Sequence, residues 1–67
     1  MTEERLRKLI EHWVEHNDEH KNRYEESAIE AVNIGLDTVA LNLKKAAEKA
    51  EDVSKYLKKA LEKFKLY

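Results

Sequence analysis

Three histidines stand four residues apart in the segment from His12 to His20, which reads His-Trp-Val-Glu-His-Asn-Asp-Glu-His. On an α-helix this spacing places His12, His16 and His20 in one row. A second row with the same spacing runs beside it and consists of Glu11, Glu15 and Glu19. Imidazole and carboxylate groups are ligands of Zn²⁺ and Ni²⁺, so this segment is a candidate metal site.

Within the row, His16 and His20 are the better pair to share one ion. His12 and His20 stand about 12 Å apart along a straight helix and cannot reach the same ion. Further ligands would come from Glu15, Glu19, a neighbouring chain or water. The sequence therefore indicates a Ni²⁺ or Zn²⁺ site formed by His12, His16, His20, Glu15 and Glu19.

The same segment twice matches the H-x-x-E-H pattern of one class of metallopeptidases, in His12–His16 and in His16–His20. A small helical protein offers no substrate cleft and no third-ligand motif for such a reaction. We therefore expect a protein that is not an enzyme. A metal-dependent hydrolase is the remote alternative.

A purely structural role for these residues is the main alternative to metal binding. His12 and His16 would then be surface residues that pair with Glu15 and Glu19. His20 and Asn17 would form a polar pair between packed helices, which fixes register or oligomeric state in the way that a single Asn does in coiled coils. Protonation of the histidines would make association depend on pH.

The composition indicates one all-α domain spanning residues 1–67. The chain has 67 residues with no proline, no cysteine and one glycine, and 40% of them are charged although the net charge is −1. So short a chain buries a small core, and we expect very regular helix packing, self-association or a bound metal to add stability. Residues 35–67 contain no arginine, no run of residues reaches the apolar length of a membrane span, and the first residues, Met-Thr-Glu-Glu-Arg, are unlike a signal peptide. We expect a cytoplasmic protein that binds neither nucleic acid nor membranes.

Helix signals divide the chain into two halves. Thr2 is the expected N-cap of a helix over about residues 3–33, and Gly35 is expected to end it in a left-handed conformation. A second helix is expected over about residues 38–66, capped by Asp37 or Thr38. Ser27-Ala-Ile-Glu30 fits a capping box, so a kink near Ser27 is an alternative to one continuous first helix.

Apolar spacing predicts which faces pack together. The first stripe contains Leu6, Ile10, Trp13, Asn17, His20, Tyr24, Ala28 and Ala31, and the second contains Leu36, Val39, Leu43, Ala46, Ala50, Val53, Leu57, Ala60, Phe64 and Tyr67. The connection allows only an antiparallel two-helix hairpin, in which facing residue numbers sum to roughly 70. Apolar surface left open predicts self-association, most simply as a dimeric four-helix bundle, with a protein partner as an alternative.

The segment from His12 to His20, with Gly35-Leu36 and the alanine-rich second half, resembles a small archaeal and bacterial helical domain of unknown function. That domain carries an H-W-[IV]-E-H-N-x-E-H segment, and the likeness extends over nearly the whole chain. Such domains are sometimes associated with nickel-binding accessory proteins, so the resemblance implies a metal-related role. It places His12, His16 and His20 with Trp13, Glu15, Asn17 and Glu19 at motif positions and implies no activity for them.

Overall fold

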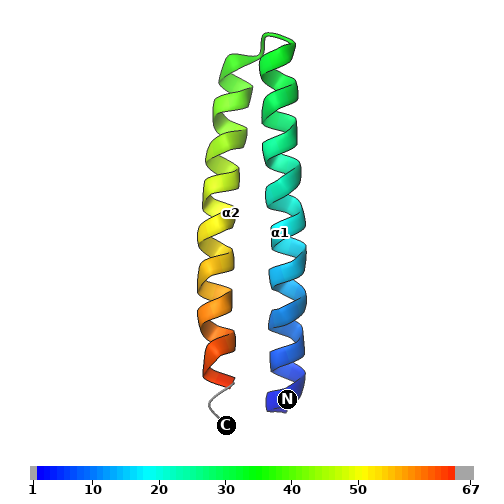
Figure 1. Cartoon of the computed structure of the whole chain (residues 1–67), viewed down its shortest axis with the longest axis vertical. Coiled ribbons are helices and arrows are strands. Elements are labelled where there is room, and N and C mark those ends of the chain that lie inside the picture. The colour runs from blue at the N-terminus through cyan, green and yellow to red at the C-terminus, as the bar shows by residue number, and fades with distance from the viewer. Residues whose placement is uncertain (1, 65–67) are drawn as a thin grey trace.

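Two long helices form an antiparallel hairpin (Figure 1). The computed structural model describes residues 2–64. In this range α1 spans Glu3–Asn33 and α2 spans Asp37–Phe64. The molecule measures 51 × 15 × 14 Å. The predicted all-α hairpin is confirmed, and the predicted end of the second helix at residue 66 lies outside the described residues.

The first helix begins at the expected N-cap and has no break at Ser27. Thr2 has extended backbone angles, and its hydroxyl accepts a hydrogen bond from the backbone N–H of Arg5 at 3.2 Å. Glu3 and Glu4 place negative charge at the positive end of the helix dipole. The alternative of a kinked helix near Ser27 is wrong, because α1 continues from Glu3 to Asn33 without interruption.

A glycine turn joins the helices. Gly35 has φ +83°, in the left-handed region. Its N–H donates to the carbonyl of Val32 at 3.0 Å, and the N–H of Leu36 donates to the carbonyl of Ala31 at 2.8 Å. These two bonds form a Schellman motif, which satisfies the last carbonyls of α1. The predicted side-chain cap of α2 is wrong, because α2 already begins at Asp37 and Leu36 holds the position before it.

The packed face of α2 differs from the predicted one by a rotation of the helix. The residues of α2 that face α1 at heptad spacing are Ala40, Leu43, Ala47, Ala50, Ser54, Leu57, Leu61 and Phe64, of which Ala40, Ala47, Ala50 and Ser54 are buried. Leu36, Val39 and Val53, predicted to be core, are each 47% exposed. Ala60 is also exposed and Ala46 is half-buried. Tyr67, predicted at the end of this stripe, lies outside the described residues.

The first helix shows the same rotation. Its packed residues are Ile10, Val14, Asn17, Lys21, Tyr24, Ala28 and Ala31, each buried or half-buried. Trp13 is 46% exposed and His20 is exposed, so their predicted core positions are wrong. Val14 and Lys21, each the next residue along the chain, face α2 instead. A heptad stripe repeats every 3.5 residues, whereas a straight α-helix has 3.6 residues per turn, so the stripe rotates slowly around the helix. Two neighbouring stripes of residues are therefore similarly placed to face the partner helix.

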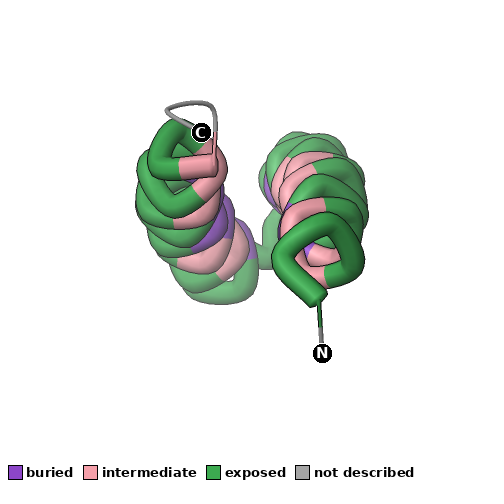
Figure 2. Tube along the Cα trace, turned by 90° about the horizontal axis from the view of Figure 1, so that it is seen from below, coloured by how far each residue is buried: buried purple, intermediate pink, exposed green. Residues whose placement is uncertain are grey.

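The contact between the helices is narrow. Figure 2 shows the buried residues along the inner sides of the two helices and exposed residues around the rest. The buried apolar residues are Ile10 and five alanines: Ala28, Ala31, Ala40, Ala47 and Ala50. Small side chains allow the helices to approach but remove little apolar area from water. Within residues 2–64, neither helix is long and apolar enough to cross a membrane.

Candidate functional site

All five candidate metal ligands lie on the surface of α1. His12, Glu15, His16, Glu19 and His20 are exposed. His20, predicted to lie between the packed helices, is therefore outside the contact with α2, because Val14, Asn17 and Lys21 occupy the inner face in this part of α1. The predicted ion pairs from His12 and His16 to Glu15 and Glu19 do not form among the described residues.

The structure brings His12 and His16 together. Their ring centroids are 4.2 Å apart, with an angle of 57° between the planes. His20 lies instead against Tyr24, with ring centroids 6.2 Å apart and planes tilted by 21°. The two imidazole rings that lie together are therefore those of His12 and His16, whereas the sequence predicts His16 and His20 as the pair that shares an ion. Within residues 2–64, no group of three or more His, Asp and Glu side chains is arranged to hold a metal ion.

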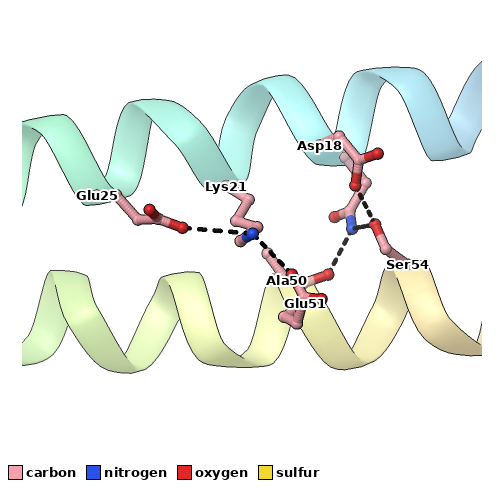
Figure 3. Close-up of polar contacts among 7 residues, drawn as sticks. Asp18, Lys21, Glu25, Ala50, Glu51 and Ser54 are labelled. Atoms are coloured by element: carbon pink, nitrogen blue, oxygen red, sulfur yellow. Dashed lines mark hydrogen bonds and ion pairs between the residues drawn. The ribbon is translucent and has the colours of Figure 1, made fainter.

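A polar network joins the helices at mid-length. The side-chain amide of Asn17 donates to the carbonyl oxygen of Ala50 at 2.6 Å and to the hydroxyl of Ser54 at 2.8 Å. The Ser54 hydroxyl donates in turn to a carboxylate oxygen of Asp18 at 2.5 Å (Figure 3). Ser54 is only 2% exposed. A buried hydroxyl without hydrogen-bond partners is energetically costly, and sliding one helix along the other would remove the partners of Ser54. The network therefore fixes the alignment of the two helices along their length.

An ion pair between the helices lies one turn from this network. The ammonium group of Lys21 is 2.7 Å from a carboxylate oxygen of Glu51 and 3.5 Å from one of Glu25 (Figure 3). The hydrogen bond from Lys21, followed by its positive charge, lowers the pKa of Glu51 below its ordinary value. The hydrogen bond to Glu51 raises the pKa of Lys21. The aliphatic stem of Lys21 occupies the packed face while its charge reaches the rim.

The hairpin has two unlike sides. One side is formed by residues that come directly after a packed residue, and the Lys21–Glu51 pair lies on it. A groove of about 780 Å³ on this side is lined by Lys21, Glu25, Lys44 and Glu51 among others. We call this the charged side, and its charged members are Glu11, Asp18, Glu25, Lys44, Glu51 and Lys58. The exposed apolar residues Ile29, Val32 and Leu41 also follow packed residues, and Ile29 and Val32 line a second groove beside Glu25 and Lys44.

The opposite side is formed by residues that come directly before a packed residue, together with neighbours one turn away. We call it the apolar side, and its members are Leu6, Leu9, Trp13, Val39, Ala46, Val53, Tyr56 and Ala60. Five of these eight are exposed, and Leu6, Leu9 and Ala46 are half-buried. Most residues predicted to be core but found exposed therefore share this one side. His16 and His20 continue it towards the turn.

Sequence reasoning identified Asn17 as a polar residue between the helices but not its partners. Its predicted partner, His20, is exposed, and Asn17 bonds to Ser54 and Ala50. The sequence predicts that the numbers of facing residues sum to roughly 70. The bonded pairs Asn17–Ser54 and Lys21–Glu51 have sums of 71 and 72, so the predicted alignment of the two helices is nearly correct. A stripe shifted by one residue along α2 would have placed Ser54 opposite Asn17 and indicated the network.

The fold and the site together define a small all-α hairpin whose helices are aligned by one polar network. By sequence, residues 6–64 match the family described as "Domain of unknown function (DUF8180)". The chain belongs to this family. It is also 46% identical, over 61 residues, to an uncharacterised protein of Archaeoglobus fulgidus, in a match that covers 88% of this chain and 94% of the relative. No solved structure matches the chain.

Proposed function

We propose that this protein is a non-enzymatic interaction module that associates with a second copy of itself to form a four-helix bundle. The observation that carries the proposal is the apolar side. Trp13, Val39 and Val53 lie there with 46%, 47% and 47% of their surfaces exposed, although each stands at core spacing. An exposed apolar surface bordered by polar residues is typical of an interface between proteins.

The accessible surface of the hairpin supports this proposal. It amounts to 5491 Å² for a chain of 7.9 kDa. A folded monomer of this mass exposes about 4,400 Å² on average. The excess of about 1,100 Å² exceeds the roughly 800 Å² that each partner buries in an interface of standard size. A second hairpin on the apolar side would remove an area of this order from water.

Sedimentation velocity tests the proposal. We expect the wild-type protein to sediment at micromolar concentration as a species of twice the 7.9 kDa chain mass. Val53→Lys places a charge within the apolar side and is expected to give a helical monomer. The matched control is Val32→Lys, because Val32 is 52% exposed and lines a groove with Glu25 and Lys44, outside the apolar side.

Two results would contradict the proposal. A wild-type protein that remains monomeric throughout the micromolar range would remove self-association. Equal dissociation of Val53→Lys and Val32→Lys would show that the apolar side is not the interface. Circular dichroism of both variants shows whether the hairpin stays helical, and loss of helix in Val53→Lys alone would mean that the interface also supports folding.

Binding of Ni²⁺ or Zn²⁺ is the second candidate function, favoured by the 4.2 Å separation of the His12 and His16 rings. Two imidazoles one helical turn apart can bind the same ion, with water or a rotated Glu15 or Glu19 completing the coordination. Titration calorimetry with each ion tests it. We expect saturable binding in wild type and in His20→Ala, and none in the double variant His12→Ala/His16→Ala. Equal binding by all three proteins would contradict a site at this pair.

A further inference from the structure

We propose that the second copy covers the apolar side with its turn at the same end of the bundle as the turn of the first. This inference rests on the proposed self-association and specifies its geometry. Two hairpins can pack face to face about a two-fold axis in two ways. An axis along the helices places both turns at one end and α1 on the partner's α2. An axis across the helices places the turns at opposite ends and α1 on the partner's α1.

Charge favours the arrangement with both turns at one end. Helix α1 carries nine acidic and five basic residues, a net charge of −4, and α2 carries five acidic and seven basic residues, a net charge of +2. With the turns at one end, every pair of neighbouring helices joins an acidic helix to a basic one. With the turns at opposite ends, α1 lies against α1 and α2 against α2, so both new contacts are between like charges.

The distribution of apolar residues along each helix leads to the same choice. On α1 the apolar side is limited to Leu6, Leu9 and Trp13, in the half far from the turn. On α2 its members are Val39, Ala46, Val53, Tyr56 and Ala60, with Asn42 and Lys49 at the same spacing between them. With the turns at one end, the apolar half of α1 meets the part of the partner's α2 that contains Tyr56 and Ala60.

The fit around Trp13 agrees with this. The numbers of facing residues within the hairpin sum to about 71, as Asn17 and Ser54 show. A two-fold axis along the helices leaves each residue at the same height along the bundle, so the same sum applies between the two copies. Trp13 of one copy therefore meets the partner's α2 near residue 58, between Tyr56 and Ala60 of the second copy, where the indole contacts one aromatic ring and one small side chain. With the axis across the middle of the helices, Trp13 would meet the partner's α1 near Arg23, in the half of α1 that has no member of the apolar side.

Distance measurement between spin labels distinguishes the two arrangements. The chain has no cysteine, so single substitutions give one label per copy. Asn33→Cys places a label beside the turn, and Glu19→Cys places one at mid-length; both residues are exposed. Helices in a bundle lie 8–10 Å apart, so labels at the turn are expected within roughly 30 Å of each other. Turns at opposite ends would separate them by nearly the 51 Å length of the hairpin.

The mid-length label is the matched control, because it gives a short distance in either arrangement. A short distance from Glu19→Cys with a long one from Asn33→Cys would overturn the proposed orientation and leave self-association intact. Absence of any dipolar coupling in both labelled proteins, with sedimentation as a monomer, would overturn the proposed function itself. Short distances from both labels are the expected result.

Discussion

At the scale of single residues, Asn17 and Ser54 set the alignment of the two helices. Five of the six buried apolar residues of the described chain are alanines, which pack almost equally well when one helix slides along the other. Hydrogen bonds are directional, and only one alignment brings the Asn17 amide to both the Ser54 hydroxyl and the Ala50 carbonyl. A polar group inside an apolar contact thereby selects one register among several.

Asn17→Ala tests this role. The variant loses both hydrogen bonds of the amide and leaves a gap beside the buried Ser54, so we expect unfolding to become easier by about 1–3 kcal/mol. Urea denaturation followed by circular dichroism, at one fixed protein concentration, measures the change. Asn22→Ala is the control, because Asn22 lies on the same helix and is exposed. Equal midpoints for the two variants would contradict a structural role for Asn17.

The Lys21–Glu51 ion pair predicts a pH dependence of stability. Because the pKa of Glu51 is lowered in the folded chain by its bond to Lys21, its stabilising contribution is complete above the ordinary value of 4.5 and is lost as the pH falls through the lowered pKa. The pKa of Lys21 is raised, so the contribution of Lys21 is complete below 10.5 and is lost as the pH rises through the raised value.

Thermal unfolding between pH 3 and 7 checks the acid side. We expect the melting temperature of Glu51→Gln to fall less on acidification than that of the wild type, because the variant has no carboxylate to protonate at this position. Glu48→Gln is the control, since Glu48 is exposed on the same helix and forms no ion pair within residues 2–64. If Glu51→Gln followed the wild-type curve, the pair would contribute nothing.

At the scale of elements, both helices and their turn could be predicted from local signals, whereas the packed faces could not. Thr2 and Gly35 mark the ends of α1 through hydrogen bonding and backbone freedom, which depend on a few neighbouring residues. The face that a helix buries depends on its partner. In α2, Val39 and Ala40 begin two apolar stripes side by side, and only the match of Ser54 with Asn17 selects the second.

Gly35→Ala tests the turn. The left-handed conformation of this residue costs an L-amino acid with a Cβ about 1–2 kcal/mol. No atom lies within 4 Å of the position that a Cβ would occupy, so the backbone alone sets the cost. We expect a loss of this size in urea denaturation and a smaller loss for Gly35→Asn, because Asn tolerates the left-handed region. Equal stability of Gly35→Ala and the wild type would contradict this account.

At the scale of the whole molecule, the sequence predicts the architecture but not how its surfaces are divided. The sequence predicts His20 between the helices, and its exposed side chain shows that this prediction is wrong. Along α2, and in the half of α1 far from the turn, apolar residues cover more of the helix surface than the partner helix buries. The apolar residues left outside the contact form most of the apolar side.

The glycine turn has a consequence for how the hairpin opens and closes. Each contact between the helices joins two residues about equally far from Gly35, so the segment between them is shortest beside the turn and longest at the far end. Closing a longer segment costs more chain entropy. The contact between the helices therefore forms first beside the Schellman motif and extends away from it. It opens first at the other end, where α1 begins and α2 ends, beyond the Asn17–Ser54 hydrogen bond.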